Sequence, residues 1–236
     1  IATNPEHWLQ EQKTHIQQHQ EHKEGGSYSS LDGQCIRPSK SRTGIVSSMD
    51  KVLVLNCVGL TPDLIKSGSM PVMQALAESQ EFHPLTPPLP AVTCTAQASM
   101  LTGQPPSQHG AVANGWYFRN LSEILFWKQS VNLLESPTVF DKWRESRPAS
   151  SSAQIFWWWN LPSKADLSVT PRPTYWANGR KSPDIHANPP SLRKRLNERL
   201  GGFPLFNFWG PGADIRSTQW IANAIVDVLK EDRPGL

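Results

Sequence analysis

The sequence predicts an α/β fold in which helices flank a mostly parallel central sheet. The run "KVLVLNCVGL" (51–60) is continuously apolar, which is typical of a strand buried on both faces of a parallel sheet. "SAQIFWWWN" (152–160) reads as a second buried strand. Amphipathic helical patterns lie between and after these two runs, and alternation of strands with helices favours α/β layers.

Four segments have a helical pattern. One begins at Pro71, since proline suits the first helical position, and "TVFDKWRES" (138–146) predicts another. "SLRKRLNERLGG" (191–202) ends in a glycine stop. In "STQWIANAIVDVLKE" (217–231) the apolar residues share one helical face: Ile221, Ala224, Ile225, Val228 and Leu229.

Two parts of the chain differ in composition. Residues 1–48 are rich in Gln, His, Ser, Gly and Lys, so we expect a polar, disordered extension that buries too little apolar surface to offset its ordering entropy. His15, His19 and His22 share helical spacing there, and a polar, partly helical tail is favoured over a metal site. We expect residues 49–236 to be a domain that stops early, because an α/β chain would enter its next central strand after "DRPGL".

Charge and cysteine usage restrict the partners and the compartment. The formal net charge is +3, and the tight basic run 193–195 lies in a predicted helix, which favours a solvated helix face over a nucleic-acid patch. The sequence contains no run of 18 apolar residues, so it predicts no membrane span. The cysteines Cys35, Cys57 and Cys94 lack metal-like spacing, and Cys57 is expected to be a reduced core thiol. An intracellular location is therefore favoured; the sequence does not indicate an oligomeric state.

The stretch 83–120 holds the candidate site. Its prolines keep the backbone extended up to Val92, and "TAQASMLTG" then favours a helix that ends at Gly103. Thr93 is thus predicted at or just before a helix N-terminus, where free amides and the helix dipole favour an anion such as phosphate. A threonine hydroxyl is a weak nucleophile unless a base or a metal lowers its pKa. The alternative is that Thr93 or Thr95 only caps the helix.

The ordered segments "KVLVLNCVGLTPDLI", "MPVMQALAE" and "LPAVTCTAQASMLTGQPPSQHGAVANGWY" are similar to the N-terminal half of the alkaline phosphatase superfamily. They resemble most the type I phosphodiesterase/nucleotide pyrophosphatase family, over about residues 51–120. The resemblance implies an alkaline-phosphatase-like layered α/β domain, of which residues 49–236 would be the N-terminal part. It also implies that Thr93 is the catalytic nucleophile and that Asn114 binds the phosphoryl group. The family's helix end and turn fall at Thr102–Gly103 and His109–Gly110.

By this resemblance, the protein is a metal-dependent hydrolase of phosphodiester or pyrophosphate bonds that forms a covalent phosphothreonine. Its cofactors would be two divalent ions, usually zinc, and its substrate a small phosphodiester or nucleotide. One departure matters: the family's metal-binding Asp is Val58 here, and an apolar side chain cannot coordinate the ion. Asn56 lies on the same face of the predicted strand, so it is a candidate metal ligand in place of that Asp, with Thr93 as the other expected metal ligand in this chain. The alternative is that Asn56 only hydrogen-bonds in the core. With the other ligands expected beyond Leu236, the chain itself is predicted to be inactive and to bind neither ion tightly.

Several alternatives stay open at this point. A catalytically degenerate member would bind a phosphorylated ligand or partner without turnover, and phosphomutase or sulfatase chemistry fits the motif "TCTAQ…HGAVANGWY" less well. His109 is expected to be a structural turn residue, and His186 a surface loop residue. Asp184 and Asp214 lie in Gly/Pro-rich loops and are candidates to frame a pocket. For the aromatics of "FWWWN" and "FPLFNFWGPG", core packing is favoured over stacking on a nucleobase.

Overall fold

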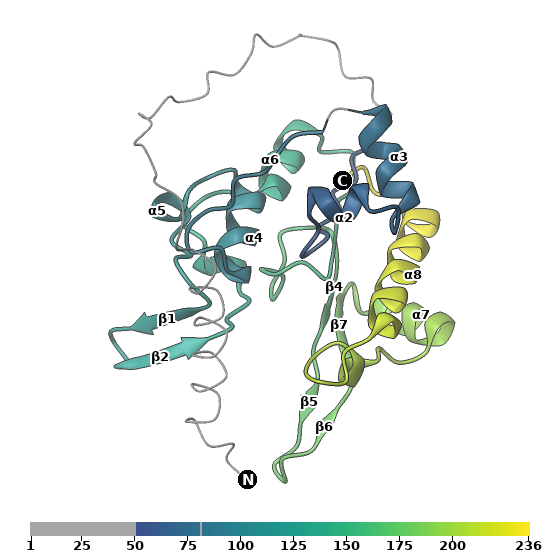
Figure 1. The fold of residues 1–236 in the computed structure, drawn as a ribbon. Helices are drawn as coiled ribbons and strands as arrows, with labels where there is room; N and C mark the ends of the chain where they lie inside the picture. Colours follow the sequence, from purple (N-terminus) through teal and green to yellow (C-terminus); the bar gives the residue numbers. More distant parts are fainter. Residues whose placement is uncertain (1–50, 81) are drawn as a thin grey trace. The chain divides into compact units, whose positions relative to one another are not determined.

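The computed structural model describes residues 51–80 and 82–236 (Figure 1). The predictions made for residues 1–48, including those on the tail histidines and Cys35, lie outside the described residues. Every helix and strand named below belongs to one compact unit of the chain.

The largest sheet has three strands in the order β3-β4-β7, and Figure 1 shows β4 and β7 running side by side. They are β3 (Ala153–Ile155), β4 (Leu167–Pro171) and β7 (Ile185–Asn188). β3 and β4 are parallel, whereas β4 and β7 are antiparallel. The described residues therefore form an α/β structure with a small mixed sheet, and the predicted mostly parallel central sheet is not found in them. Two antiparallel hairpins complete the strands: β1 (Gly115–Phe118) with β2 (Glu123–Phe126), and β5 (Thr174–Tyr175) with β6 (Lys181–Ser182).

The apolar run 51–60 is not a buried strand, so this prediction is wrong for the structure. Residues 51–57 have no regular secondary structure and belong to no sheet, and the side chains of Val52 to Leu55 are 45–58% exposed. Cys57, expected in the core, is also exposed. The reason is a lack of neighbours: within the described residues, one backbone hydrogen bond, from Val52 N–H to the Gly235 oxygen (2.8 Å), joins this segment to the rest. A strand becomes buried only when other strands and helices cover it.

The predicted helices form close to their expected positions. They are α3 (Pro71–Ser79), α6 (Val139–Ser146), α7 (Pro190–Leu200) and α8 (Ile215–Glu231). α6 begins with a capping box, in which Asp141 accepts hydrogen bonds from both the N–H and the hydroxyl of Thr138 (2.8 Å each). The other helical segments are α2 (Pro62–Lys66), α4 (Thr93–Thr102), α5 (Pro106–His109), η1 (Val131–Leu133) and η2 (Leu205–Asn207).

Two hydrophobic clusters stabilise these elements. The first joins the three-stranded sheet to α7 and α8, which lie beside β7 and β3 (Figure 1). In it, the Phe156 ring packs on Phe203 (centroids 4.8 Å apart) and on Trp220 (5.9 Å). The second cluster joins α4 and α6 around the fully buried Trp159, which meets Trp116 edge to face at 5.5 Å. These aromatics confirm that much of both aromatic runs is core packing.

The basic run of α7 is ion-paired within the chain. Asp227 of α8, which is 8% exposed, accepts hydrogen bonds from Arg195 (2.8 Å) and Arg199 (2.6 Å). Arg195 also pairs with Asp232, and Arg193 binds both carboxylate oxygens of Asp184. The arginines of this run therefore pair with residues outside α7, whereas the prediction was a solvated helix face.

We expect Asp227→Ala to lower the free energy of unfolding by about 1–3 kcal/mol, because it removes the carboxylate that joins two guanidinium groups to α8. The arginines are partly exposed, which keeps the loss below that of a fully buried pair. Urea unfolding followed by circular dichroism measures it. The matched control is Glu198→Ala, which breaks the exposed Lys194–Glu198 pair and should change stability by less than about 0.5 kcal/mol. Equal losses in both variants would contradict this role of Asp227.

Candidate functional site at the N-terminus of helix α4

Thr93 is the first residue of helix α4, as the sequence predicted. The N-cap residue is Val92, which has no side chain able to cap, so the alternative that Thr93 or Thr95 is the N-cap is wrong. The helix ends at Gly103, whose φ of 66° lies in the left-handed region that glycine readily adopts. The Thr93 side chain is exposed, and the helix N-terminus beside it presents backbone N–H groups that no intrahelical carbonyl can accept.

Small residues let α4 pack closely against the tryptophan-rich segment that follows β3. Cys94 and Ala98 are fully buried. The Trp159 indole N–H donates to the Cys94 carbonyl oxygen (3.1 Å), and the Trp158 backbone N–H donates to the Gln97 side-chain oxygen (2.7 Å). These bonds fix the position of the first two turns of the helix.

Asn114 lies at the same helix end. Its side-chain oxygen accepts a hydrogen bond from the Cys94 backbone N–H at 3.0 Å, one residue after Thr93. Its own carbonyl oxygen accepts from Trp127 N–H at 2.9 Å, which ties it to the β1–β2 hairpin. With the oxygen engaged, the side-chain NH2 group makes no hydrogen bond to the described residues and keeps two donors for a ligand. The predicted neighbours Thr93 and Asn114 therefore meet at one helix terminus.

The residues next to Thr93 are poor nucleophiles by comparison. Burial raises the pKa of the Cys94 thiol to about 12, so this cysteine stays protonated at neutral pH. The Thr95 hydroxyl is fully buried and has no hydrogen-bond partner in the described part of the chain. Of these three consecutive side chains, Thr93 alone is open to a substrate.

His109 is built into the turn that follows α4. The Ala111 N–H donates to its Nδ1 (3.0 Å), so Nδ1 must accept, and the proton of the neutral ring is on Nε2, 2.9 Å from the Ser99 hydroxyl oxygen. In this tautomer His109 donates to Ser99 and cannot take a proton from it. The helix α5 that carries His109 ends at Gly110 (φ 77°). The geometry fits the structural turn residue that the sequence analysis expected.

The other polar candidates have structural positions as well. His186 lies on strand β7 with its side chain exposed, so its predicted place in a loop is wrong. Asp184 is paired with Arg193, and Asp214 caps helix α8 by accepting from Arg216 N–H at 2.9 Å. Neither aspartate lines the cavity that borders Thr93. The sequence pattern did not predict the pairing of Asp184 with Arg193 or the capping of α8 by Asp214.

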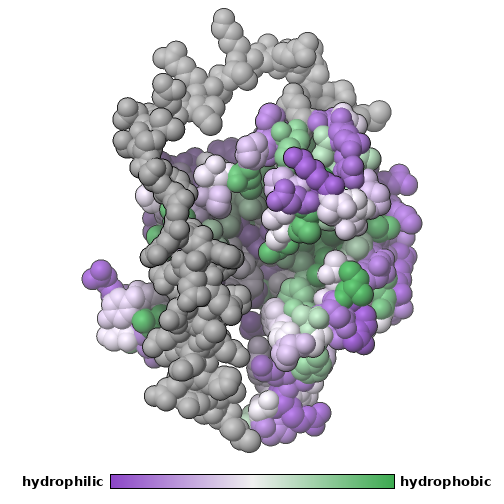
Figure 2. Space-filling model, in the orientation of Figure 1, coloured by the Kyte–Doolittle hydropathy of each residue, from purple (hydrophilic) through white to green (hydrophobic). Residues whose placement is uncertain are grey.

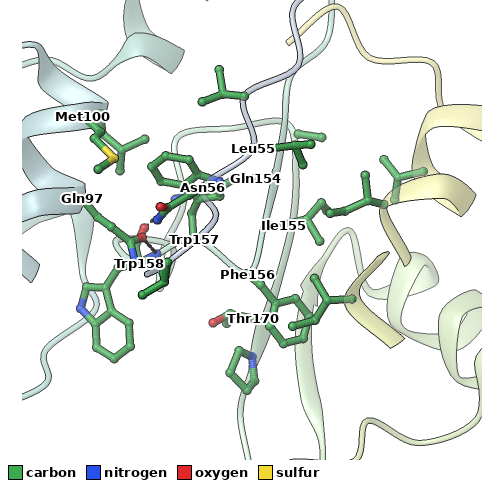
Figure 3. Close-up of a pocket in the computed structure, with 18 of the residues that line it drawn as sticks. Leu55, Asn56, Gln97, Met100, Gln154, Ile155, Phe156, Trp157, Trp158 and Thr170 are labelled. Atoms are coloured by element: carbon green, nitrogen blue, oxygen red, sulfur yellow. Dashed lines mark hydrogen bonds between the residues drawn. The ribbon is translucent and has the colours of Figure 1, made fainter. Parts of the chain in front are cut away.

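A cavity of about 1340 Å³ borders Thr93. It is lined by residues 51–58, by α4, by β3 with the segment after it, and by α8. Figure 3 shows Asn56, Gln97 and Met100 toward one side and Ile155 and Phe156 toward the other. In the space-filling view, hydrophobic residues gather around a hollow near the middle of the visible face (Figure 2). Four tryptophans also line the cavity: Trp127, Trp157, Trp158 and Trp209.

The comparison with protein families identifies the chain. The family model described as Type I phosphodiesterase / nucleotide pyrophosphatase matches residues 52–236. The chain belongs to this family. No curated protein and no solved structure matched the chain. Among the helices of the described residues, none is sufficiently long and apolar to cross a membrane.

The phosphodiesterase family is generally metal-dependent, and the residues near Thr93 do not fit such a site. Asn56 lines the same cavity as Thr93, but together they offer an amide and a hydroxyl. Across residues 51–80 and 82–236, no three His, Cys, Asp or Glu side chains come together as metal ligands. Val58 lies in a turn with 89% of its surface exposed, so it does not share a strand face with Asn56 as predicted. Divalent ions are held in proteins chiefly by carboxylate, imidazole and thiolate groups.

We expect the stability of the protein to fall as the pH is lowered from 7.5 to 5. Burial lowers the pKa of His109 below its ordinary value of 6.5, so protons bind more strongly to the unfolded chain. The contribution of neutral His109 is therefore complete above about pH 6.5 and is lost as the pH falls toward the lowered pKa of the folded state. Urea unfolding at a series of pH values measures this slope.

His109→Gln should lower stability at pH 7.5 by about 1–3 kcal/mol, because buried hydrogen bonds are lost, and should flatten the pH dependence. His186→Gln, at an exposed histidine, is the matched control and should keep the slope of the unsubstituted protein. An unchanged slope in His109→Gln would show that other groups cause the acid sensitivity.

Proposed function

We propose that this chain supplies the nucleophile and the phosphoryl-binding group of a phosphodiesterase or nucleotide pyrophosphatase site. Thr93 is the nucleophile, and Asn114 binds a non-bridging phosphoryl oxygen. Membership of the family supports a hydrolase of phosphodiester or pyrophosphate bonds with a small phosphodiester or nucleotide as substrate. The observation that carries the proposal is the hydrogen bond between Cys94 N–H and Asn114, which holds an amide donor beside an exposed threonine at a helix N-terminus.

The binding step uses dipoles rather than charged side chains. The N-terminal end of α4 carries the positive end of the helix dipole, and the free N–H groups of its first turn can donate to a phosphoryl oxygen. The Asn114 NH2 group adds one or two donors from the side. A hydrogen bond to an anionic group contributes about 1.5–3 kcal/mol, so two such bonds are enough to orient a phosphodiester at Thr93.

The chemical step is a displacement at phosphorus. The Thr93 oxygen forms a bond to phosphorus while the bond to the leaving oxygen breaks, and the hydroxyl proton must pass to an acceptor. Asn114 stabilises the charge on the non-bridging oxygen as the bond forms. Water then cleaves the phosphothreonine and regenerates the hydroxyl.

A base or a metal ion must lower the pKa of the Thr93 hydroxyl before it attacks. The described residues around Thr93 offer neither a carboxylate nor an imidazole that lines the cavity with it. The proposal therefore assigns binding and nucleophile placement to this chain, with little or no turnover by the chain alone.

Binding without turnover is the second candidate, and the position of Val58 favours it. An exposed valine stands where the family has a metal-binding aspartate, and the nearest substitute, Asn56, is uncharged. In this case the same site would hold a phosphorylated ligand and Thr93 would form no covalent bond. Both candidates share the Asn114 contact, and only the first requires the Thr93 hydroxyl.

Asn114→Asp tests the binding step, with AMP as the probe in isothermal titration calorimetry. The substitution keeps the shape of the side chain but replaces two donors by negative charge, so we expect AMP affinity to fall at least about tenfold, equivalent to about 1.4 kcal/mol. Asn120→Asp, at an exposed position in the β1–β2 turn, adds the same charge and should have a small effect. Equal affinity in both variants would remove Asn114 from the site.

Thr93→Ala separates catalysis from binding. We expect the unsubstituted chain, on prolonged incubation with bis(p-nitrophenyl) phosphate, to acquire a p-nitrophenyl phosphoryl adduct at Thr93 as one p-nitrophenolate leaves, detected by peptide mass spectrometry. Thr93→Ala should lose the adduct and retain AMP binding within about threefold, since the helix N–H groups remain. Thr102→Ala, at the other end of α4, is the control. If AMP binds and no adduct forms on Thr93, the second candidate is favoured.

A further inference from the structure

Arg172 is a cation on the wall of the cavity that borders Thr93. The described lining residues include two basic side chains, those of Arg172 and Lys51, and no Asp or Glu. Arg172 is exposed, and its guanidinium group makes no hydrogen bond or ion pair with residues 51–80 and 82–236. The arginines of α7, by contrast, all bind carboxylates. The donors of Arg172 are therefore not used within the described part of the chain.

The backbone around Arg172 is held in place. Strand β4 ends at Pro171, and both Pro171 and Pro173 are buried, so the arginine is an exposed residue between two buried prolines. Proline fixes its own φ and restricts the residue before it. The Arg172 N–H also donates to the Asp184 carbonyl oxygen at 2.9 Å. The side chain therefore starts from a fixed point, which reduces the backbone freedom that ligand binding must remove.

Arg172 follows the sheet at the edge that is also joined to helix α4. Strands β3 and β4 are parallel, so their carboxyl ends lie at one edge of the sheet. Just after β3, the Trp158 N–H donates to the Gln97 side chain of α4 (2.7 Å), and just after β4 comes Arg172. Ligands of open α/β sheets bind outside the carboxyl ends of the strands. Arg172 is thus on the side of the cavity where α4 is attached.

Lys51, the other basic residue of the lining, is tied to the opposite end of β3. Its neighbour Val52 donates to the Gly235 oxygen, and the Gly235 N–H donates to the Ser151 oxygen, two residues before β3 begins (2.8 Å each). The two cations therefore mark different ends of the cavity.

A further positive charge lies next to the cavity on the β5–β6 hairpin. Tyr175 of β5 lines the cavity, and its partner across the hairpin is Lys181 of β6. The Lys181 ammonium lies 5.4 Å from the centroid of the Tyr175 ring, a cation–π contact. This charge adds to the attraction of an anion near the carboxyl end of β4.

We propose that Arg172 binds a second anionic group of the substrate, so that the site selects diphosphates over substrates that carry a single phosphate. The inference rests on the proposed function, in which Asn114 and the α4 N-terminus bind the phosphoryl group at Thr93. Those groups are neutral dipoles, whereas a second phosphate adds charge that a cation can offset. A guanidinium group suits this role, because its planar set of N–H donors matches two phosphate oxygens at once.

The test is isothermal titration calorimetry of the 236-residue chain in buffer with EDTA, with AMP and ADP as probes. The two probes share the nucleoside, so the ratio of their affinities reports the added phosphate. We expect ADP to bind at least about tenfold more tightly than AMP. Arg172→Gln should lower this ratio below about threefold and leave AMP affinity within about threefold. Arg172→Lys, which keeps the charge but not the planar donors, should lower the ratio less than Arg172→Gln.

Two matched variants show whether the effect is specific. Arg119→Gln removes an exposed arginine outside the cavity, and Lys51→Gln removes the cation at its other end; both should keep the ratio within about threefold of the unsubstituted chain. Loss of the ADP preference in Lys51→Gln, and not in Arg172→Gln, would overturn the proposal.

The experiment also separates this inference from the proposed function. AMP binding that depends on Asn114, together with an ADP affinity less than about threefold higher in the unsubstituted chain, would overturn the role of Arg172 and leave the proposed function intact. Binding of neither nucleotide would overturn both.

Discussion

The hydrogen bond from Cys94 N–H to the Asn114 side chain is the constraint on which the candidate site depends. It satisfies one of the free N–H groups at the α4 N-terminus and fixes the orientation of the Asn114 amide, whose NH2 group makes no hydrogen bond to the described residues. The indole of Trp159 holds the carbonyl of the same residue, Cys94, from within the core. The helix start is thus fixed from both sides, and Thr93 is presented at a defined position with its hydroxyl exposed.

The electrostatics of this site differ from those elsewhere in the chain. The strong charge pairs gather between α7, α8 and β7, where Asp227 and Asp184 bind the arginines of α7. The cavity that Thr93 borders is lined by amide and hydroxyl side chains and by two basic side chains, those of Lys51 and Arg172, with no carboxylate among the described lining residues. A helix N-terminus with a neutral amide attracts an anion moderately and does not, by itself, create an alkoxide. The local chemistry therefore suits phosphoryl binding better than unaided hydrolysis.

The exposed apolar segment and the cavity have a common physical cause. Residues 52–55 are hydrophobic enough to be buried on both faces, yet burial of a strand requires backbone partners as well as apolar neighbours. The helices α4 and α8 supply apolar neighbours, whereas Gly235 supplies a backbone partner at one end only, where it accepts from Val52 N–H. The other backbone groups of residues 53–57 have no backbone hydrogen bond to another described segment, so this segment is not part of the sheet.

The sequence by itself determined the longer helices, the start of α4 at Thr93 and the glycine that ends it, whereas the place of Asn114 beside Thr93 was expected from the family resemblance. These features depend on local rules: prolines keep the approach extended, small residues favour the helix, and glycine permits a left-handed end. Only the tertiary structure decided that 51–60 forms no strand, that β3 ends at Ile155, and that Val58 lies in an exposed turn away from the face expected for Asn56. Strand pairing and ligand assembly are non-local, because each requires backbone or side-chain groups from distant segments at the same place, and periodicity along one segment carries no information about those partners.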